Sequence, residues 1–403
     1  MSPTPAVTYT ARFHSLDSLR AAMMLLGICL HSALTYMTVP VAVWPFRDRS
    51  QSPICDFLMF FIHVFRMPLF FVLAGFFASM VYNRAGAAGF LRHRAKRILL
   101  PFVLAWLVLF VPTTAGMIYG ANSLGPDPWG AMETYFRSGA YLSPLRTLHL
   151  WFLYYLLHFY VMATLLAALM PILLSARLRT RLQQAFRTVA GSMWRPLILA
   201  APTCATLYFM NSGGLDTNAT FLVTPASLVA YSVFFGFGWL LFQHADLISG
   251  FQRHAAAQVA IALALLPLNA KYTAETMRAL PAYDAAAHSV AIVTASLIVW
   301  LLIFGFMGLA QRYLSAGSSR VRYLSDASYW MYLIHLPVVL WLQVAMVPWQ
   351  SPGFIKFAVV MLATTAITLW SYSSLIRYSF IGTALHGVRR RGDEQPLSRA
   401  ASA

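Results

Sequence analysis

The feature that most constrains this chain is a series of long apolar segments separated by short polar ones. A helix needs about 20 mainly apolar residues to cross a bilayer. Only 10% of the residues are charged, whereas a soluble domain carries about 25%. We therefore predict an all-α fold, a polytopic transmembrane helical bundle with about ten spans. The expected spans are 16–40, 54–82, 98–119, 149–174, 195–210, 225–243, 255–270, 287–311, 327–347 and 354–376.

The distribution of lysine and arginine predicts the orientation of these spans. If the N-terminus is cytoplasmic, 21 of the 29 basic residues fall in cytoplasmic segments and seven on the opposite side. Cytoplasmic loops of membrane proteins carry such an excess. Both termini are therefore expected in the cytoplasm. The net charge of +17 is interpreted as topology signal and contact with anionic lipid, and not as nucleic-acid binding.

Two parts of unequal size are expected along the chain. Residues 12–376 would form the membrane domain, and the basic stretch 377–403 a disordered cytoplasmic tail. The three cysteines, at positions 29, 55 and 204, have no metal-ligand spacing. Neither a metal site nor a disulfide is expected.

The first span carries two ionisable residues, Arg20 and His31, on one otherwise apolar segment. Eleven helical steps nearly close three turns, so the two residues share a face and lie about 16 Å apart along the axis. This places His31 deep in the membrane, where an ionisable group is costly and usually marks a site. The alternative is a histidine bonded to a neighbouring helix. No acidic residue lies clearly at mid-span, which argues against a proton-coupled transporter.

Histidine suits general-base chemistry because its pKa lies near neutral pH. His31 has no carboxylate close by on its own helix. Any group that orients it must come from another helix, and the sequence does not name it.

The second span holds His63 and Arg66, three residues apart and therefore on one helix face. The guanidinium of Arg66 matches a carboxylate or phosphate. The alternative is a structural pair, either with Asp56 or with backbone carbonyls. The two interpretations have equal weight at this stage.

Two further candidates lie at span entrances. Arg94 and Arg97 are three residues apart at the predicted cytoplasmic surface. They represent either topology charge or a phosphate clamp for a nucleotide-bearing ligand. His149 opens the fourth span on the far side and is a candidate contact for an extracytoplasmic acceptor. The aromatic residues around His335 in the ninth span are interpreted as an interfacial belt.

These motifs together resemble a known family. RFHSLDSLRAAMMLLGICLHSALTY contains arginine, ten residues and histidine, and LRHRAKRILLPF contains two arginines with two residues between them. With FIHVFRMPLFFVLAGFF, HLWFLYYL and SYWMYLIHLPVV, they are similar to segments of membrane acyltransferase family 3. The pattern most resembles its glucans biosynthesis protein C branch, which is associated with glucan succinylation.

The resemblance implies an acyl-CoA-dependent O-acyltransferase in the bacterial inner membrane. Its donor substrate would be cytoplasmic acyl-CoA, succinyl-CoA for this branch. Its acceptor would be hydroxyl groups of a periplasmic glucan, and no cofactor would be bound permanently. The family's motif residues map onto His31 as the catalytic histidine. They map onto Arg20, Arg94 and Arg97 as the donor site.

These lines combine into one hypothesis. The arginines hold the coenzyme A phosphates, and the pantetheine arm brings the thioester to His31. His31 then acts as general base or transiently carries the acyl group. Arg66 with His63 would bind the distal carboxylate of a succinyl group. Two alternatives remain: an O-acetyltransferase acting on another cell-surface carbohydrate, and an exporter of carbohydrate or lipid-linked carbohydrate that performs no chemistry.

Overall fold

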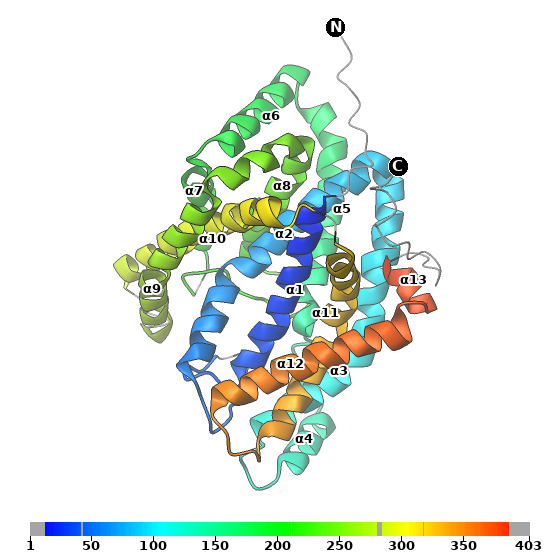
Figure 1. Cartoon of the computed structure of the whole chain (residues 1–403), viewed down its shortest axis with the longest axis vertical. Coiled ribbons are helices and arrows are strands. Elements are labelled where there is room, and N and C mark those ends of the chain that lie inside the picture. The colour runs from blue at the N-terminus through cyan, green and yellow to red at the C-terminus, as the bar shows by residue number, and fades with distance from the viewer. Residues whose placement is uncertain (1–12, 42, 211, 280–283, 317, 387–403) are drawn as a thin grey trace, which may run out of the picture.

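The computed structural model describes residues 13–41, 43–210, 212–279, 284–316 and 318–386, and helices dominate these segments (Figure 1). The predicted all-α, polytopic bundle is confirmed. Eight helices are long and apolar enough to cross a membrane. Within the described residues, β-structure is limited to isolated bridges, one between Val41 and Trp44 and one between Arg146 and Thr220.

The N-terminal part is a helical hairpin preceded by one span. α1 (His14–Leu34) is followed by α2 (Pro53–Arg94), η1 (Ala95–Leu99) and α3 (Leu100–Ala121). α2 turns sharply at Gly86, where φ is 67°. This left-handed conformation is open to glycine because it has no Cβ. The second and third predicted spans thus lie in one helical stretch of 69 residues.

The middle of the chain contributes shorter helices at both ends of the molecule. α4 (Pro128–Arg137), η2 (Ala140–Leu142) and η3 (Leu148–Leu150) lead into α5 (Trp151–Leu173), α6 (Ala176–Gly191) and α7 (Arg195–Leu207). α4 and the arginine-rich α6 lie at opposite ends (Figure 1). We call these the α4 end and the α6 end. α1 runs from the α6 side toward the α4 side (Figure 1).

The C-terminal half completes the bundle. It comprises α8 (Pro225–Gln243), η4 (Ala245–His254), α9 (Ala255–Ala279), α10 (Ala285–Tyr313), α11 (Ser319–Met346), α12 (Gly353–Ser371), η5 (Tyr372–Ile376) and α13 (Phe380–His386). The first part of the expected disordered tail is therefore helical, and residues 387–403 lie outside the described residues.

Two differences between the predicted spans and the helices concern the first and the fifth span. α1 ends at Leu34 and not at residue 40, because the chain turns there and leads into the α1–α2 segment. α7, the predicted fifth span, has 13 residues, fewer than the roughly 20 that a crossing needs. The count of ten spans stays a prediction.

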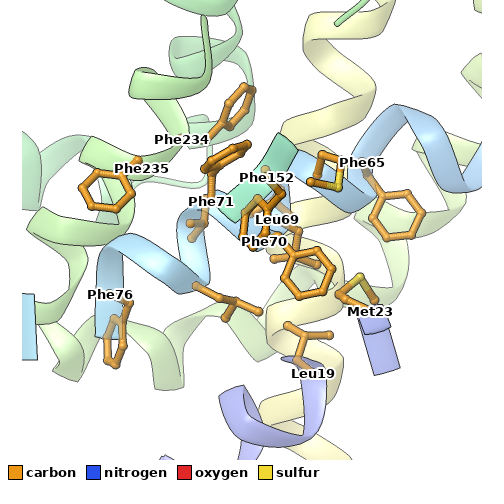
Figure 2. Close-up of a cluster of buried hydrophobic side chains, with 14 of the residues drawn as sticks. Leu19, Met23, Phe65, Leu69, Phe70, Phe71, Phe76, Phe152, Phe234 and Phe235 are labelled. Carbon is orange, nitrogen blue, oxygen red and sulfur yellow. The ribbon is translucent and has the colours of Figure 1, made fainter. Parts of the chain in front are cut away.

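A large apolar core holds α1, α2, α5 and α8 together (Figure 2). Leu19 of α1, Phe71 of α2 and Phe234 of α8 are among its buried side chains. α2 and α8 cross with their backbones in contact, since a Cβ on Gly75 or Gly238 would collide with the opposite helix backbone. Small residues at membrane-helix crossings permit such close packing. The crossing fixes α2, which carries His63 and Arg66, against the bundle.

Candidate functional site

α1 and α11 pack side by side and contact each other at two levels. Toward the α6 end, Arg20 Nη2 donates a hydrogen bond to Ser325 Oγ at 3.1 Å. Further along, His31 Nδ1 lies 2.9 Å from His335 Nε2. Eleven residues on one helix and ten on the other separate the two levels, about 16 and 15 Å. The helices therefore run parallel, and the predicted stripe of α1 faces α11.

The histidine pair has a defined protonation pattern. His335 Nδ1 lies 2.7 Å from the carbonyl oxygen of Tyr332, which can only accept, so this nitrogen carries the proton. In a neutral imidazole the other nitrogen is then an acceptor, and His31 Nδ1–H donates to it. The lone pair of His31 is thereby left on Nε2, and the imidazole also lies within hydrogen-bond reach of the Gly27 carbonyl on its own helix. His31 is half-buried, whereas His335 is buried.

His149 joins the pair from the start of α5. Its ring centroid lies 5.1 Å from that of His335, and its Nε2–H donates to the carbonyl oxygen of Leu333 at 2.9 Å. The hydroxyl of Tyr332 in turn donates to the backbone oxygen of His149 at 2.8 Å. His149 is buried because the η3 turn brings its ring against α11. It thus lies behind His335 and not at the open entrance that the acceptor hypothesis assigned to it.

The segment between α1 and α2 covers His31 from the α4 side. Trp44 stacks on the imidazole of His31 at a centroid separation of 6.0 Å. Its indole Nε1 donates to Thr35 Oγ1 at 2.9 Å, which anchors the ring. The cover over His31 is therefore an uncharged aromatic one.

Arg66 lies beside His31, one turn nearer the α6 end. A Cβ added to Gly27 would lie 3.0 Å from Arg66 Nη1, so the guanidinium rests on α1 where a side chain is missing. Arg66 is 7% exposed, and its Nε and Nη1 have no hydrogen-bond partner among the residues that the structure describes. Its recorded contacts are the sulfur of Met67 at 3.5 Å and the ring of Phe70 at 6.0 Å. A buried guanidinium without a carboxylate is suited to receive an anion.

His63 points away from the histidine pair. Its ring lies near the backbone of Leu215 and the carboxylate of Asp216, in the segment between α7 and α8. His63 and Arg66 share a helix side as expected, but they contact different parts of the molecule. The expected joint binding of a carboxylate by both therefore has geometric support from Arg66 alone.

The three predicted donor-site arginines gather around Phe77 and Tyr329. Arg20 pairs with Asp17 at 3.2 Å and lies over the Phe77 ring. Arg94 Nη2 donates to the Phe77 carbonyl at 3.0 Å and so pins the Gly86 turn. The backbone oxygen of Arg97 accepts a hydrogen bond from Tyr329 Oη at 3.1 Å.

The arginines differ in whether their side chains are already engaged in contacts within the fold. Arg94 is committed to the fold through Phe77 and through the ring of Tyr160, 4.9 Å from its Cζ. Arg97 is half-buried, and no hydrogen bond or ion pair of its side chain is recorded in the part of the chain that the structure describes. Arg94 and η1 adjoin each other, and π-helical turns are frequent at functional sites.

A small hollow lies beside Arg20, lined by Asp17, Ser18 and Ser325 among others. Its volume is about 10 Å³, which holds one water molecule and no more. The hollow is therefore too small in this structure to admit a larger group. Among the described residues, no group of three or more His, Cys, Asp and Glu side chains is placed to hold a metal ion.

The sequence analysis missed the role of α11. Ser325, Tyr329, Tyr332 and His335 follow one another at spacings of four, three and three residues. They therefore form one helix face, and this face contacts Arg20, Arg97, His149 and His31 in turn. The spacing was readable, but three of the four residues are typical of an interfacial belt, which hid the pattern.

The part of the chain that matches known proteins contains all the residues of this site. The sequence matches the family model described as "Acyltransferase domain" over residues 13–373. A protein of Escherichia coli named glucans biosynthesis protein C is 26% identical, covering 98% of this chain and 100% of its own. The protein of that name from Salmonella heidelberg is 27% identical, covering 94% of each chain. No solved structure shows significant similarity to this chain.

Proposed function

The chain belongs to the acyltransferase family whose pattern covers residues 13–373, and on that premise we propose that it carries an acyl group across a bacterial inner membrane. The donor in this proposal is cytoplasmic acyl-CoA, and the acceptor is a hydroxyl of a periplasmic glucan. The similar proteins named for glucan biosynthesis support the acceptor class. The arginine-rich α6 supports placing the α6 end in the cytoplasm.

The observation that carries the proposal is the His31–His335 pair. His335 holds the Nδ1–H of His31 and leaves the Nε2 lone pair for chemistry. In the proposed step, Nε2 of His31 accepts the proton of the sugar hydroxyl while the hydroxyl oxygen attacks the thioester carbonyl. The carbon–sulfur bond of the thioester breaks, and the leaving coenzyme A thiolate accepts from His31 the proton that came from the sugar hydroxyl. His335 is a positioning residue, since it acts through His31.

The donor is proposed to enter from the α6 end. Arg20 is partly exposed and Arg97 has no recorded side-chain partner among the described residues, so both are suited to hold phosphate groups. Arg94 supports the turn that presents them. The hollow of about 10 Å³ beside Arg20 must widen for a pantetheine arm to pass. The distance of about 16 Å from Arg20 to His31 is then the path of the thioester.

Arg66 favours an anionic acyl group over a neutral one. Its guanidinium is buried and unpaired beside the helix that carries His31. A succinyl group brings a distal carboxylate that matches it, whereas an acetyl group brings none. We therefore propose succinyl-CoA as the donor, with Arg66 as the contact that selects it.

The central experiment uses purified protein, labelled acyl-CoA and a glucan acceptor. Succinyl transfer should exceed acetyl transfer, and His31→Ala should abolish transfer while the protein still inserts and folds in membranes. Ser32→Ala serves as a matched control, because the neighbouring Ser32 hydroxyl has no recorded partner. Full activity of His31→Ala would refute the catalytic assignment. Equal use of succinyl-CoA and acetyl-CoA would instead support a donor range like that of an O-acetyltransferase.

A further inference from the structure

A second concave region lies at the α4 end, separate from the histidine site. It has a volume of about 580 Å³ and lies between the α1–α2, α3–α4 and α11–α12 connections. We call it the α4-end pocket. Such a volume is within the range of about 300–1,000 Å³ that small-molecule sites occupy. Its lining includes Arg49, Ser50, Ser123, Trp349, Gln350 and Lys356.

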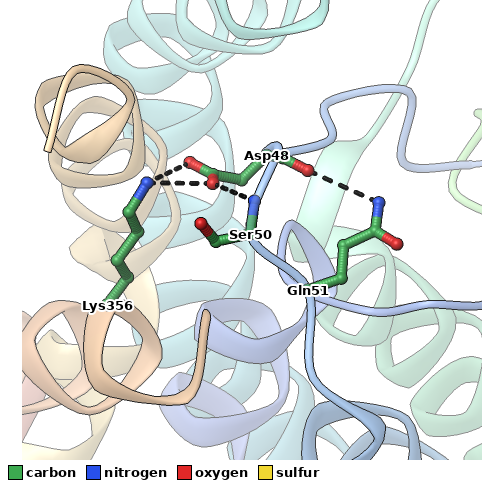
Figure 3. Close-up of polar contacts among 4 residues, drawn as sticks. All are labelled: Asp48, Ser50, Gln51 and Lys356. Carbon is green, nitrogen blue, oxygen red and sulfur yellow. Dashed lines mark hydrogen bonds and ion pairs between the residues drawn. The ribbon is translucent and has the colours of Figure 1, made fainter. Parts of the chain in front are cut away.

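In the wall of the α4-end pocket, the charge of Lys356 is neutralised by Asp48 (Figure 3). Lys356 Nζ lies 2.9 and 3.0 Å from the two carboxylate oxygens of Asp48. The backbone N–H of Ser50 donates to the same carboxylate at 2.8 Å. Asp48 and Lys356 are both buried. The pair therefore fixes the wall of the pocket and presents no net charge to a ligand.

The accessible lining has the chemistry that a carbohydrate requires. Trp349 is 43% exposed and offers an aromatic surface for the C–H face of a sugar ring, since its ring is apolar with a polar tip. The amide of Gln350 both donates and accepts, as sugar hydroxyls do, and the Ser123 hydroxyl, which donates to the Gly120 carbonyl, offers an acceptor. Arg49 adds donors, and no carboxylate of the described residues lines the pocket. A neutral, hydroxyl-rich ligand fits this set better than a cation.

The pocket is connected to His31 through one continuous segment. The N–H of Asp48 donates to the Thr35 carbonyl at 3.0 Å, and Thr35 Oγ1 accepts from Trp44, which stacks on His31. At its other side the segment presses on α12, since a Cβ on Gly353 would lie 2.6 Å from the Ser50 oxygen. The wall of the pocket and the cover of His31 are thus parts of one braced element.

We propose that the α4-end pocket docks non-reacting glucose units of the acceptor glucan, with Trp349 as the stacking platform. This proposal rests on the proposed function for its ligand class. A chain held there keeps a neighbouring hydroxyl close to the Trp44 cover of His31. The pocket sets acceptor affinity, and the histidine pair performs the transfer.

The test measures acceptor and donor dependence separately. Trp349→Ala and Gln350→Ala are compared with Trp129→Ala, an exposed tryptophan of α4 at the same end that does not line the pocket. Linear glucose oligosaccharides of a single linkage and increasing length serve as acceptors. The acceptor KM of Trp349→Ala should rise about tenfold, the effect of losing one contact of about 1.4 kcal/mol. The donor KM and acceptor-free thioester hydrolysis should not change.

Direct binding separates this proposal from the proposed function. Calorimetric titration of the same oligosaccharides should show binding that Trp349→Ala weakens and Trp129→Ala does not. Binding through Trp349 without any acyl transfer would keep the docking site and refute the transferase. Acyl transfer with an unchanged acceptor KM in Trp349→Ala would support the transferase and refute the docking site. Absence of oligosaccharide binding to the unmodified protein also overturns the docking site.

Discussion

Lys356 and Arg66 are both buried cations in the membrane domain, yet their surroundings are opposite. Lys356 is 2% exposed and is held by both oxygens of Asp48, whose side chain is 1% exposed. Arg66 is 7% exposed, and two of its nitrogens have no hydrogen-bond partner in the described part of the chain. A buried charge is tolerated when it is paired and costly when it is not. The charge of Lys356 is neutralised within the fold, whereas Arg66 is the cation for which an anionic ligand is proposed.

The two cations also differ in what surrounds them. Asp48 lies in a connection that must be fixed over the bundle, and its pairing with α12 does this. Arg66 lies next to α1, the helix that carries His31, and Gly27 leaves room for its guanidinium. Unpaired ionisable groups inside membranes mark ligand pathways. Substitution of Asp48 should therefore lower stability, whereas substitution of Arg66 should lower activity.

The largest effect is expected from breaking the finished pair. Asp48→Asn leaves Lys356 buried without a counter-charge, which should lower the free energy of unfolding by about 3–5 kcal/mol. Thermal unfolding in detergent checks this through a lower Tm. The double variant Asp48→Asn with Lys356→Met removes both charges and should recover most of the loss. A single variant as stable as the parent would show that the pair is not the brace inferred here.

Arg66→Met should show the reverse behaviour. It removes an unpaired charge, so Tm should stay the same or rise. Succinyl transfer should fall about 100-fold in kcat/KM, which corresponds to about 2.7 kcal/mol for one lost charged contact. Acetyl transfer should stay within about twofold, because that acyl group has no carboxylate to lose. Kinetics with the two donors measure both.

Arg195→Met is the matched control for Arg66. Arg195 is also buried and also has unpartnered nitrogens, but its guanidinium lies over the rings of Phe251 and Phe304. Its loss should affect both donors equally. If Arg66→Met also reduced succinyl and acetyl transfer to the same extent, the carboxylate role would be wrong.

The bundle and the stripe on α1 were predictable because they depend on local patterns. Hydropathy over about 20 residues identifies membrane helices, and the spacing of Arg20 and His31 follows from helix geometry alone. The resemblance of these motifs to an acyltransferase family is likewise a property of short segments. The charge difference between the loops is also a property of short segments, and it predicts the orientation of the spans.

The pairings across the bundle were not predictable from one sequence. His335 lies 304 residues from His31, and Asp48 lies 308 residues from Lys356. Hydrophobic periodicity carries no information about which helices become neighbours. Lys356 is one of the seven basic residues that the charge count places opposite the cytoplasm, yet its charge is buried against Asp48. The merging of two spans at Gly86 was hidden because helical propensity continues on both sides of the turn.

The smallest effect is expected from Gly27→Ala, and it tests how closely the guanidinium of Arg66 is placed. The new Cβ would lie 3.0 Å from Nη1 and 3.2 Å from Cζ of Arg66, so the guanidinium must shift by a few tenths of an ångström. Alanine also favours the helix over glycine by about 1 kcal/mol, which opposes any loss of stability. Tm should therefore hold or rise while the KM for succinyl-CoA increases about threefold.

The same substitution should leave the KM for acetyl-CoA unchanged, and Gly89→Ala provides the control. Gly89 is a glycine of α2 whose added Cβ would meet only the Ala85 side chain at 3.0 Å. An equal rise in KM for both donors would mean that Gly27→Ala disturbs the His31 helix and not the anion contact. A selective rise would show that the space beside Gly27 is kept open for Arg66. The guanidinium would then rest on α1 a little more than one helical turn from His31.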